Sequence, residues 1–406
     1  MKCLVIMDIN GLESDMRCVK LKVLWAGPFL SDNALLTKLA TKPSEARWSS
    51  GLLRGLSDNG CEIRVISHCP EQRWPKGRVF WQNNAQKWFR DAFPCERIGY
   101  LNVWGIKGHW LDWAYTRAAK KIFREWRPEV VLCYNSLHSF NVAVMREAHK
   151  RGIKCVPIIL DGDDPRRDNW KKLLRDNRFA DGVVFLSWWM YKNYPRQDMP
   201  LLHMDGGAEA FKGDPSPMTN DHPLETRQYT LVHTGALDYW RGLEFMKGVV
   251  HACKRQDVRF VFCGKCDRAK MWAEFGNDSR VEVKGFLSNE EMAAICQSAD
   301  ILLSVREPKV GDNVVNYPSK IPNYLAWGKP IVSTWVPSLS SEYRDILEIP
   351  ADDTPEAFAR KIDEVLVWDG EKKCDKFNQI KAWFEARKSW VKQSERLVEF
   401  IRSIAG

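Results

Sequence analysis

Residues 281–334 constrain the fold of this chain more than any other segment. The stretch VEVKGFLSNEEMAAICQSADILLSVREPKVGDNVVNYPSKIPNYLAWGKPIVST holds three apolar strands, separated by an amphipathic helix and by a helix that follows a Pro-Ser-Lys turn. Strands that alternate with helices predict a parallel sheet, and such sheets bind ligands at the carboxyl ends of their strands. Because free N–H groups at a helix start beside a lysine suit a phosphate, the segment predicts a site for an anionic nucleotide.

Length and composition indicate two globular domains in a cytoplasmic protein. The 406 residues exceed one typical domain, and 45% apolar with 28% charged residues is ordinary for a soluble protein. No apolar run approaches the roughly 20 residues of a membrane-spanning helix, and the start of the chain lacks the apolar core of a secretory signal. Twelve cysteines without a disulfide framework favour reduced thiols in a cytoplasm.

The basic excess of the chain lies entirely in its first half. Residues 1–210 contain 33 lysines and arginines against 23 acidic residues, whereas the remaining residues contain 28 against 29. Such an excess favours an anionic partner, either a membrane surface or a polyanion. The alternative is a bias that serves solubility and binds no partner.

The pattern along the chain predicts two Rossmann-like units. Strand and helix signals alternate in both halves, and the segment between the halves is rich in glycine, proline, aspartate and asparagine, as linkers are. Near the end, apolar residues at near-helical spacing predict one long helix over residues 380–404. The predicted boundaries are 1–20 for an N-terminal extension, 21–210 for the first unit, 211–228 for the linker, 229–376 for the second unit and 377–406 for the C-terminal helix.

The order of these features resembles the GT-B glycosyltransferases, and most closely glycosyltransferase family four, the group 1 transferases. That family carries the motif Pro-Ser-Lys-x-x-Glu-Tyr-x-Ala-x-Gly-Lys-Pro, and residues 318–330 read PSKIPNYLAWGKP. The resemblance spans residues 21–403. It implies two Rossmann-like doubly wound domains that face a cleft, with a C-terminal helix that crosses back towards the first domain. Weaker matches are the helix–Gly60–strand unit, Ala180-Asp181 before a strand, and Ser389-Trp390 in the last helix.

Several family positions are changed in this chain. In the loop that opens the second domain, Ala236 replaces the family's first cation, and Arg241 stands where a lysine is usual. The family's pair of glutamates corresponds to Val315 and Asn323, so neither carboxylate is present. Asn323 can still accept a hydrogen bond from a ribose through its amide oxygen. Asn313, Asn316 and Glu307 are the alternatives for the contact with the sugar hydroxyls.

The resemblance assigns roles to residues of both domains. The predicted catalytic residues are Arg241, Lys320 and Asp161. The predicted donor-binding residues are Gly235, Ala236, Gly264, Phe286, Leu287, Asn316, Tyr317, Pro318, Ser319 and Asn323. The predicted acceptor-side residues are Gly27, His138, Asp163 and Trp188.

The chemistry that the resemblance implies is sugar transfer from a nucleoside diphosphate, most readily a UDP-sugar, with retention of configuration and without an essential metal or other cofactor. Negative charge develops on the leaving phosphate, and a helix start together with Arg241 and Lys320 would stabilise it. The leaving phosphate can itself take the proton of the acceptor hydroxyl, so no separate carboxylate base is required.

Other motifs leave alternatives open. The sequence Asp161-Gly162-Asp163-Asp164 imitates a divalent-metal motif, but a loop that lines the acceptor cleft or a plain turn is favoured, and no metal is predicted. Cys263 and Cys266 form a lone Cys-x-x-Cys, for which a structural role is favoured over zinc or redox chemistry. His233 is interpreted either as a core histidine or as a cleft residue. The basic segment 166–178 fits either a solvated face or an anion-binding face. The tryptophans, among them Trp188, Trp189 and those of residues 74–110, fit a core, a surface that stacks on sugars or bases, or a bilayer interface.

Three functions from different classes remain at this point. The first is a glycosyltransferase whose acceptor is a lipid-linked or cell-envelope glycan, so that the protein is cytoplasmic and peripheral at an anionic membrane, in polysaccharide biosynthesis. The second is a glycosyltransferase that acts on hydroxylated bases of DNA, with the base flipped out of the duplex. The third is a catalytically inactive binding module on the same fold, because the family glutamates are missing.

Overall fold

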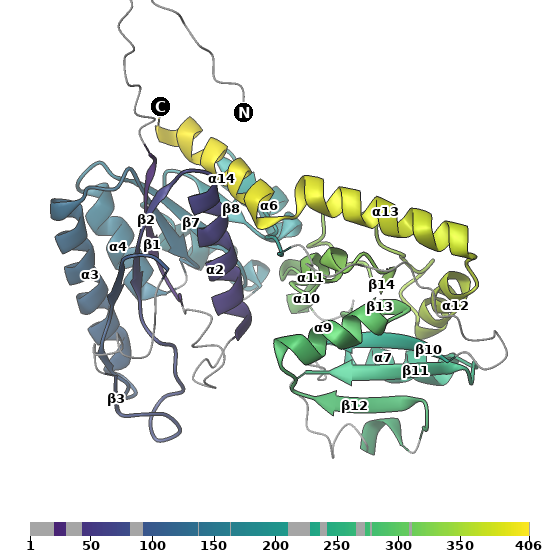
Figure 1. Cartoon of the computed structure of the whole chain (residues 1–406). Helices are drawn as coiled ribbons and strands as arrows, with labels where there is room; N and C mark the ends of the chain where they lie inside the picture. The colour runs from purple at the N-terminus through teal and green to yellow at the C-terminus, as the bar shows by residue number, and fades with distance from the viewer. Residues whose placement is uncertain are drawn as a thin grey trace, which may run out of the picture.

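The chain forms two sheet domains that are bridged by two helices near its C terminus (Figure 1). The computed structural model describes residues 20–29, 43–81, 92–136, 138–162, 164–209, 228–235, 242–264, 273–276, 278–307 and 311–405. The predicted linker lies almost wholly outside the described residues, as do most of the N-terminal extension and the predicted site residues Ala236, Arg241 and Asp163.

The first domain is built on a parallel seven-stranded sheet in the order β4-β2-β1-β6-β7-β8-β9. Its central strands are apolar along their whole length because helices cover both faces, which is the pattern that the sequence showed. The strands are β1 (Lys22–Ala26), β2 (Glu62–Ser67), β4 (Cys95–Arg97), β6 (Val130–Tyr134), β7 (Lys154–Ile159), β8 (Val183–Phe185) and β9 (Leu201–His203).

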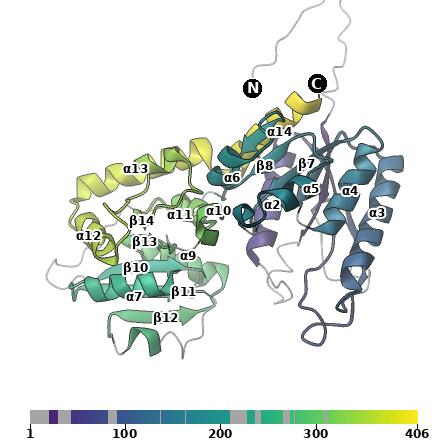
Figure 2. The ribbon, with the colours of Figure 1, turned by 180° about the vertical axis from the view of Figure 1, so that it is seen from behind.

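Helices pack on both faces of this sheet. One buried cluster joins α3 and α4 to one face of β1 and β6, and another joins α2 and the last helix to the opposite face. Figure 2 shows α6 on the side of the domain that faces the second one. The helices are α2 (Pro43–Asp58), α3 (Lys107–Glu125), α4 (Ser139–His149), the 3-10 helix η2 (Pro165–Arg167), α5 (Lys171–Asp176) and α6 (Trp188–Asn193).

The second domain contains a parallel five-stranded sheet in the order β12-β11-β10-β13-β14. The alternation predicted for residues 281–334 is confirmed, and the loop before the Pro-Ser-Lys turn adds a short helix, α10. The strands are β10 (Tyr229–Thr234), β11 (Val258–Cys263), β12 (Val281–Gly285), β13 (Ile301–Ser304) and β14 (Ile331–Ser333). The helices are α7 (Leu243–Ala252), α9 (Asn289–Ser298), α10 (Gly311–Val315), α11 (Ile321–Ala326), the 3-10 helix η5 (Ser341–Asp345) and α12 (Pro355–Leu366).

The predicted single helix over residues 380–404 is wrong, because the chain forms two helices there. Helix α13 (Gly370–Arg387) lies over the second domain, and α14 (Trp390–Ala405) lies over the first (Figure 1). The break falls at Lys388 and Ser389. The Lys388 side chain turns into a buried acidic cluster, its carbonyl accepts a hydrogen bond from Ala208 N at 2.9 Å, and Ser389 Oγ accepts one from Lys392 N. The first two contacts are tertiary, and the Ser389 hydroxyl caps the first turn of α14.

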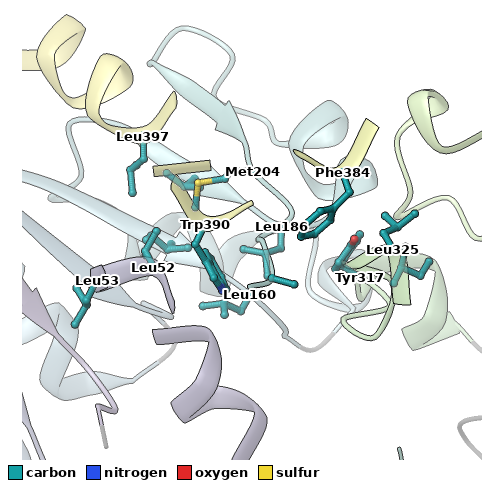
Figure 3. Packing of buried hydrophobic residues seen from close by; sticks show 14 of the residues in the cluster. Leu52, Leu53, Leu160, Leu186, Met204, Tyr317, Leu325, Phe384, Trp390 and Leu397 are labelled. Carbon is teal, nitrogen blue, oxygen red and sulfur yellow. The ribbon is translucent and has the colours of Figure 1, made fainter. Parts of the chain in front are cut away.

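Helix α14 packs closely against α2. A Cβ atom on Gly51 would lie 2.1 Å from Trp390 Nε1, and one on Gly55 would lie 2.5 Å from the carbonyl oxygen of Trp390, so both positions require glycine. Buried side chains continue from this contact into the second domain. Figure 3 shows this run from Trp390 past Leu186 to Phe384 and Tyr317. The two domains therefore share one apolar junction.

Within the segment that lacks a clear period, β3 (Phe80–Trp81) pairs with β5 (Tyr100–Leu101) in a small two-stranded antiparallel sheet. Within the described part of the chain, no helix is long and apolar enough to cross a membrane.

Candidate functional site

Glycines form a rim at the carboxyl ends of three strands in the second domain. Gly235 follows β10 with φ +96°, a left-handed conformation that favours glycine. A Cβ atom on Gly264, which follows β11, would lie 2.3 Å from the carbonyl oxygen of Gly235. Gly235 N donates to Cys263 O and Gly264 N donates to Gly285 O, each at 2.7 Å. The rim is therefore free of side chains at Gly235 and Gly264, where a ligand can approach the backbone closely.

Lys320 supplies a positive charge at this rim. A Cβ atom on Gly235 would lie 3.8 Å from Lys320 Nζ, so the ammonium group stands beside the glycine loop. The same Nζ lies 3.0 Å from Nε2 of His233, the buried residue two positions before Gly235. The structure thus brings together the predicted residues Lys320, Gly235 and Gly264.

His233 determines where the Lys320 ammonium lies. Its Nδ1 is 3.1 Å from the carbonyl oxygen of Leu303, which can only accept, so Nδ1 carries the proton and Nε2 accepts from Lys320. Burial and the charge of Lys320 hold the pKa of His233 well below its usual range. The imidazole is therefore neutral near pH 7. His233 is a buried core residue, and its Nε2 holds Lys320 beside the glycine rim. The contact was hidden from sequence reasoning because His233 and Lys320 are 87 positions apart in the chain.

Tyr324 anchors the Pro-Ser-Lys segment to the sheet. Its hydroxyl accepts hydrogen bonds from Thr234 N at 2.7 Å and from Thr234 Oγ1 at 3.0 Å. Helix α11 has only six residues and Lys320 is its N-cap residue, so its dipole is small and the Lys320 ammonium carries most of the positive charge.

Not all predicted donor residues face the rim. Tyr317 and Pro318 are buried, and the Tyr317 hydroxyl is hydrogen-bonded to the Tyr343 hydroxyl at 2.7 Å, so these residues support the loop from behind. Asn316 Oδ1 accepts a hydrogen bond from Gly162 N of the first domain at 3.2 Å. Asn316 therefore joins the two domains, while its neighbour Asn313 is buried against Arg306 and the carbonyl oxygen of Glu307.

The remaining donor residues lie near the rim. Phe286 and Leu287 follow β12, and the Phe286 side chain is 73% exposed. Ser319 and Asn323 are exposed at the start of α11, and their predicted contacts with a nucleotide stay predictions. Arg241 lies outside the described residues, but a Cβ atom on the adjacent Gly242 would lie 2.8 Å from Val305 Cγ1, next to the end of β13.

The acidic loop after β7 faces the second domain. Asp164 accepts hydrogen bonds from Nε and Nη2 of Arg166 at 2.9 and 2.6 Å, and this pairing lowers the pKa of Asp164. Arg167 forms an ion pair with Asp312 of the second domain at 3.1 Å. Asp161 is exposed, and its carbonyl oxygen accepts from Asn135. Because Asp164 is already paired with Arg166, we interpret the acidic loop as a contact between the domains and not as a metal site. The described residues contain no cluster of three potential metal ligands.

A pocket of about 270 Å³ opens beside this loop. Its apolar wall contains Ile159, Leu173 and Met190, and its polar wall includes Arg167 and Lys172. The basic segment predicted from the sequence therefore lines a cavity on the first-domain side of the interdomain contact. The sequence offered no signal for the cavity itself, which depends on how α5 and α6 pack against β7.

The predicted acceptor residues have different surroundings. A Cβ atom on Gly27 would lie 2.3 Å from Tyr134 Cβ, so this glycine permits a close approach between two strand ends. His138 is exposed and stacks on Phe140 with 5.1 Å between ring centroids. Trp188 N donates to Ser338 O of the second domain at 2.9 Å, and its ring lies 5.0 Å from that of His203. Trp188 therefore helps to join the domains.

Comparison with known proteins identifies the fold. Residues 228–367 match the family model described as "Glycosyl transferases group 1". A search of curated proteins finds no match for this sequence. Among solved structures, a glycosyltransferase from Rickettsia africae ESF-5 has 12% identity and a TM-score of 0.65, over 95% of this chain and 99% of that one.

Two further structures are similar along their whole length. Anabaena Alr3699/HepE in complex with UDP and glucose has 13% identity and a TM-score of 0.64, over 94% of this chain and 100% of that one. The lipopolysaccharide outer core galactosyltransferase WaaB, in its apo form, has 13% identity and a TM-score of 0.61, over 94% and 99%. At these identities the likeness shows the fold, which confirms the predicted GT-B arrangement of two Rossmann-like domains.

Proposed function

We propose that this chain, which has a GT-B fold and a group 1 glycosyltransferase domain, transfers a sugar from a UDP-sugar to a hydroxyl acceptor. The observation that carries the proposal is the Lys320 ammonium beside Gly235, held there by neutral His233. A fixed cation next to bare backbone suits the diphosphate of a nucleotide sugar. HepE, which shares the fold, was solved with UDP and glucose.

In this proposal the second domain holds the donor and the first domain holds the acceptor. The diphosphate lies on the glycine rim, where Lys320 stabilises the negative charge that develops as the sugar leaves, and Arg241 adds a second cation. The Lys320 ammonium, together with the cation that Arg241 contributes to this loop, supports a mechanism without a metal ion. The leaving phosphate oxygen takes the proton of the acceptor hydroxyl on the face from which it departed, so the sugar keeps its configuration.

The proposed acceptor is a lipid-linked or cell-envelope glycan, reached from the cytoplasmic side of a membrane. Support comes from the basic excess of residues 1–210 and from the fold shared with WaaB, a lipopolysaccharide galactosyltransferase. Transfer to hydroxylated DNA bases is the second acceptor class that a basic surface would serve. An inactive binding module is the remaining alternative, and turnover of a UDP-sugar would exclude it.

Nucleotide binding tests the proposed donor. Calorimetric titration with UDP, GDP and ADP in the presence of a chelator should show binding, with UDP bound tightest, because the rim supplies its own cation. A thermal shift with the same ligands should rise with concentration, since ligand that binds only the folded state raises apparent stability. Failure of all three nucleotides to bind, or binding only after magnesium or manganese is added, would contradict the proposal.

His233→Phe tests the positioning of Lys320. Phenylalanine keeps an aromatic ring in the buried position but offers no acceptor, so Lys320 should lose its fixed place and UDP-sugar turnover should fall by about 10- to 100-fold. His233→Asn retains an acceptor oxygen and should recover part of that loss. Because the pKa of His233 is well below its usual range, its titration should leave no inflection in the wild-type pH–rate profile between about pH 6 and 8. An unchanged rate in the phenylalanine variant would remove His233 from the mechanism.

A further inference from the structure

Large apolar side chains gather on one exposed surface of the first domain. They come from the loop before β3, from β3 itself, from the turn after β5 and from the first turns of α3. We call this surface the aromatic face. Its members and their exposed fractions are Trp74 52%, Val79 45%, Phe80 46%, Trp104 76%, Ile106 46%, Trp110 36% and Trp113 57%. Contiguous exposed groups of this kind mark interaction sites more often than isolated ones do.

The aromatic face is held together by hydrogen bonds beneath it. Asn102 is fully buried, and its Nδ2 donates to Gln72 O at 2.7 Å and to Arg78 O at 2.9 Å. The backbone of Asn102 also accepts from Trp74 N and donates to Val79 O. One amide side chain therefore fixes the loop before β3 against β5. The backbone that carries the exposed rings of this loop is held in place by hydrogen bonds.

The exposed rings also contact one another. The ring centroids of Phe80 and Trp110 are 6.4 Å apart, and those of Trp110 and Trp113 are 6.1 Å apart. Trp110 Nε1 donates to Gly99 O at 3.1 Å, which ties α3 to the chain before β5. The rings of Phe80, Trp110 and Trp113 thus form one patch although β3 and α3 are separated along the chain. Burying this patch against a partner would cost little ordering entropy, because hydrogen bonds already hold its backbone.

Cationic side chains lie beside the aromatic face in the loop before β3. Arg73, Lys76 and Arg78 are exposed in the loop that carries Trp74 and Val79. Glu71, the acidic residue of that loop, accepts a hydrogen bond from Trp81 Nε1. The outer surface of the loop is therefore cationic around an apolar centre.

We propose that the aromatic face docks the protein on an anionic lipid bilayer. Tryptophan rings sit well at the headgroup level, and lysine and arginine attract acidic lipids. The aliphatic residues Val79 and Ile106 favour a bilayer over single-stranded nucleic acid, because bases stack on aromatic rings and gain little from aliphatic side chains. The identity of the acceptor rests on the function proposed above, whereas docking on lipid is testable without it.

Docking through this surface would direct the cleft towards the membrane. Helix α3 follows β5 and returns to the start of β6, so its first turns lie on the side where the parallel strands end. The glycine turn at Gly27 and the acidic loop after β7 lie on that same side of the sheet. Figure 1 shows β3 at the lower end of the first domain, away from α13 and α14. A lipid-linked acceptor in the bilayer would then enter from the docked side.

Vesicle sedimentation tests the proposal with the full chain. Wild-type protein should bind vesicles of phosphatidylcholine with added phosphatidylglycerol more tightly than phosphatidylcholine alone, and salt should weaken the binding. The variant Trp104→Ser/Trp113→Ser should bind at least about tenfold more weakly. The variant Arg73→Gln/Lys76→Gln should lose about thirtyfold, since each cation near a lipid surface contributes a factor of about five. All four side chains are exposed, and circular dichroism checks that the variants fold.

Lys171→Gln/Arg175→Gln is the matched control, because it removes two exposed basic residues from another surface of the same domain. This control should keep most of the vesicle binding.

Equal binding by wild type and both face variants, or loss only in the control, would overturn the proposal. Binding of a DNA oligonucleotide in place of vesicles, weakened by the face variants, would assign the surface to nucleic acid instead. UDP titration of wild type and of every variant distinguishes the two proposals. If wild-type protein does not bind UDP, the donor-site proposal is contradicted and the lipid-docking result is unaffected.

Discussion

Lys320→Ala is expected to lower the kcat for UDP-sugar turnover by about 100- to 1000-fold, the cost of removing one fixed charge that stabilises a transition state. The ammonium is held beside Gly235 by the hydrogen bond to buried His233, so it need not reorganise when charge develops on the leaving phosphate. Its effect should be larger on kcat than on the affinity for UDP, because the charge grows during the reaction.

Two comparisons make the Lys320 experiment specific. Lys381→Ala removes an exposed lysine from α13 and should leave kcat and UDP affinity near the wild-type values. Lys320→Arg keeps the charge but changes its shape, so partial activity is expected where the alanine variant has little. If Lys320→Ala turned over substrate at the wild-type rate, the assignment of this rim as the donor site would be wrong.

Lys388→Met is expected to lower the free energy of unfolding by about 3–5 kcal/mol, because it leaves a buried carboxylate without its counter-ion. Lys388 Nζ lies 2.8 and 2.9 Å from the two oxygens of Asp205, and both side chains are 1% exposed. The same ammonium donates to Glu342 at 2.8 Å, and Tyr343 donates to Asp205 at 2.7 Å. The cluster joins the first domain, the second domain and the break between α13 and α14, so its loss should also loosen the domain junction.

The pH dependence of this effect follows from Asp205. Burial alone would raise the pKa of its carboxyl, but the charge of Lys388, with a smaller contribution from His203, outweighs burial and holds the pKa below its usual value. A lowered pKa gives stability that is present above the unfolded value, about 3.9, and that is lost as pH falls through the folded value. In Lys388→Met the carboxyl is buried without compensation and its pKa should rise. The stability gap between the two proteins should therefore be full at pH 7 and should narrow in acid.

Denaturant unfolding at several pH values measures this gap. The double variant Lys388→Met/Asp205→Leu should recover much of the stability, since removing both charges leaves less uncompensated charge than removing one. Glu342, which is partly exposed, can meet water after the change. A single variant as stable as wild type at pH 7 would show that the cluster does not hold the domains together.

Local patterns in the sequence were sufficient for the framework of the fold. Apolar strands that alternate with amphipathic helices over residues 281–334 predicted β12, α9, β13, α11 and β14, because burial on both faces makes a parallel strand apolar throughout. The family resemblance assigned Gly235 and Lys320 to one donor site, and they meet because the carboxyl ends of neighbouring parallel strands share one edge of the sheet. These features depend on interactions within a few residues or between adjacent strands.

Contacts between distant segments decided the rest. The hydrogen bond from Lys320 to His233 spans 87 residues, and the ion pair of Lys388 with Asp205 spans 183. Hydrophobic periodicity reports which side of an element is buried but not what covers it, so it predicted one C-terminal helix where a buried lysine breaks the chain into two. The same reasoning noted the tryptophans of residues 74–110 but left a core, stacking and a bilayer interface open, because these residues follow no single period. They share a surface only because Asn102 ties three short segments together.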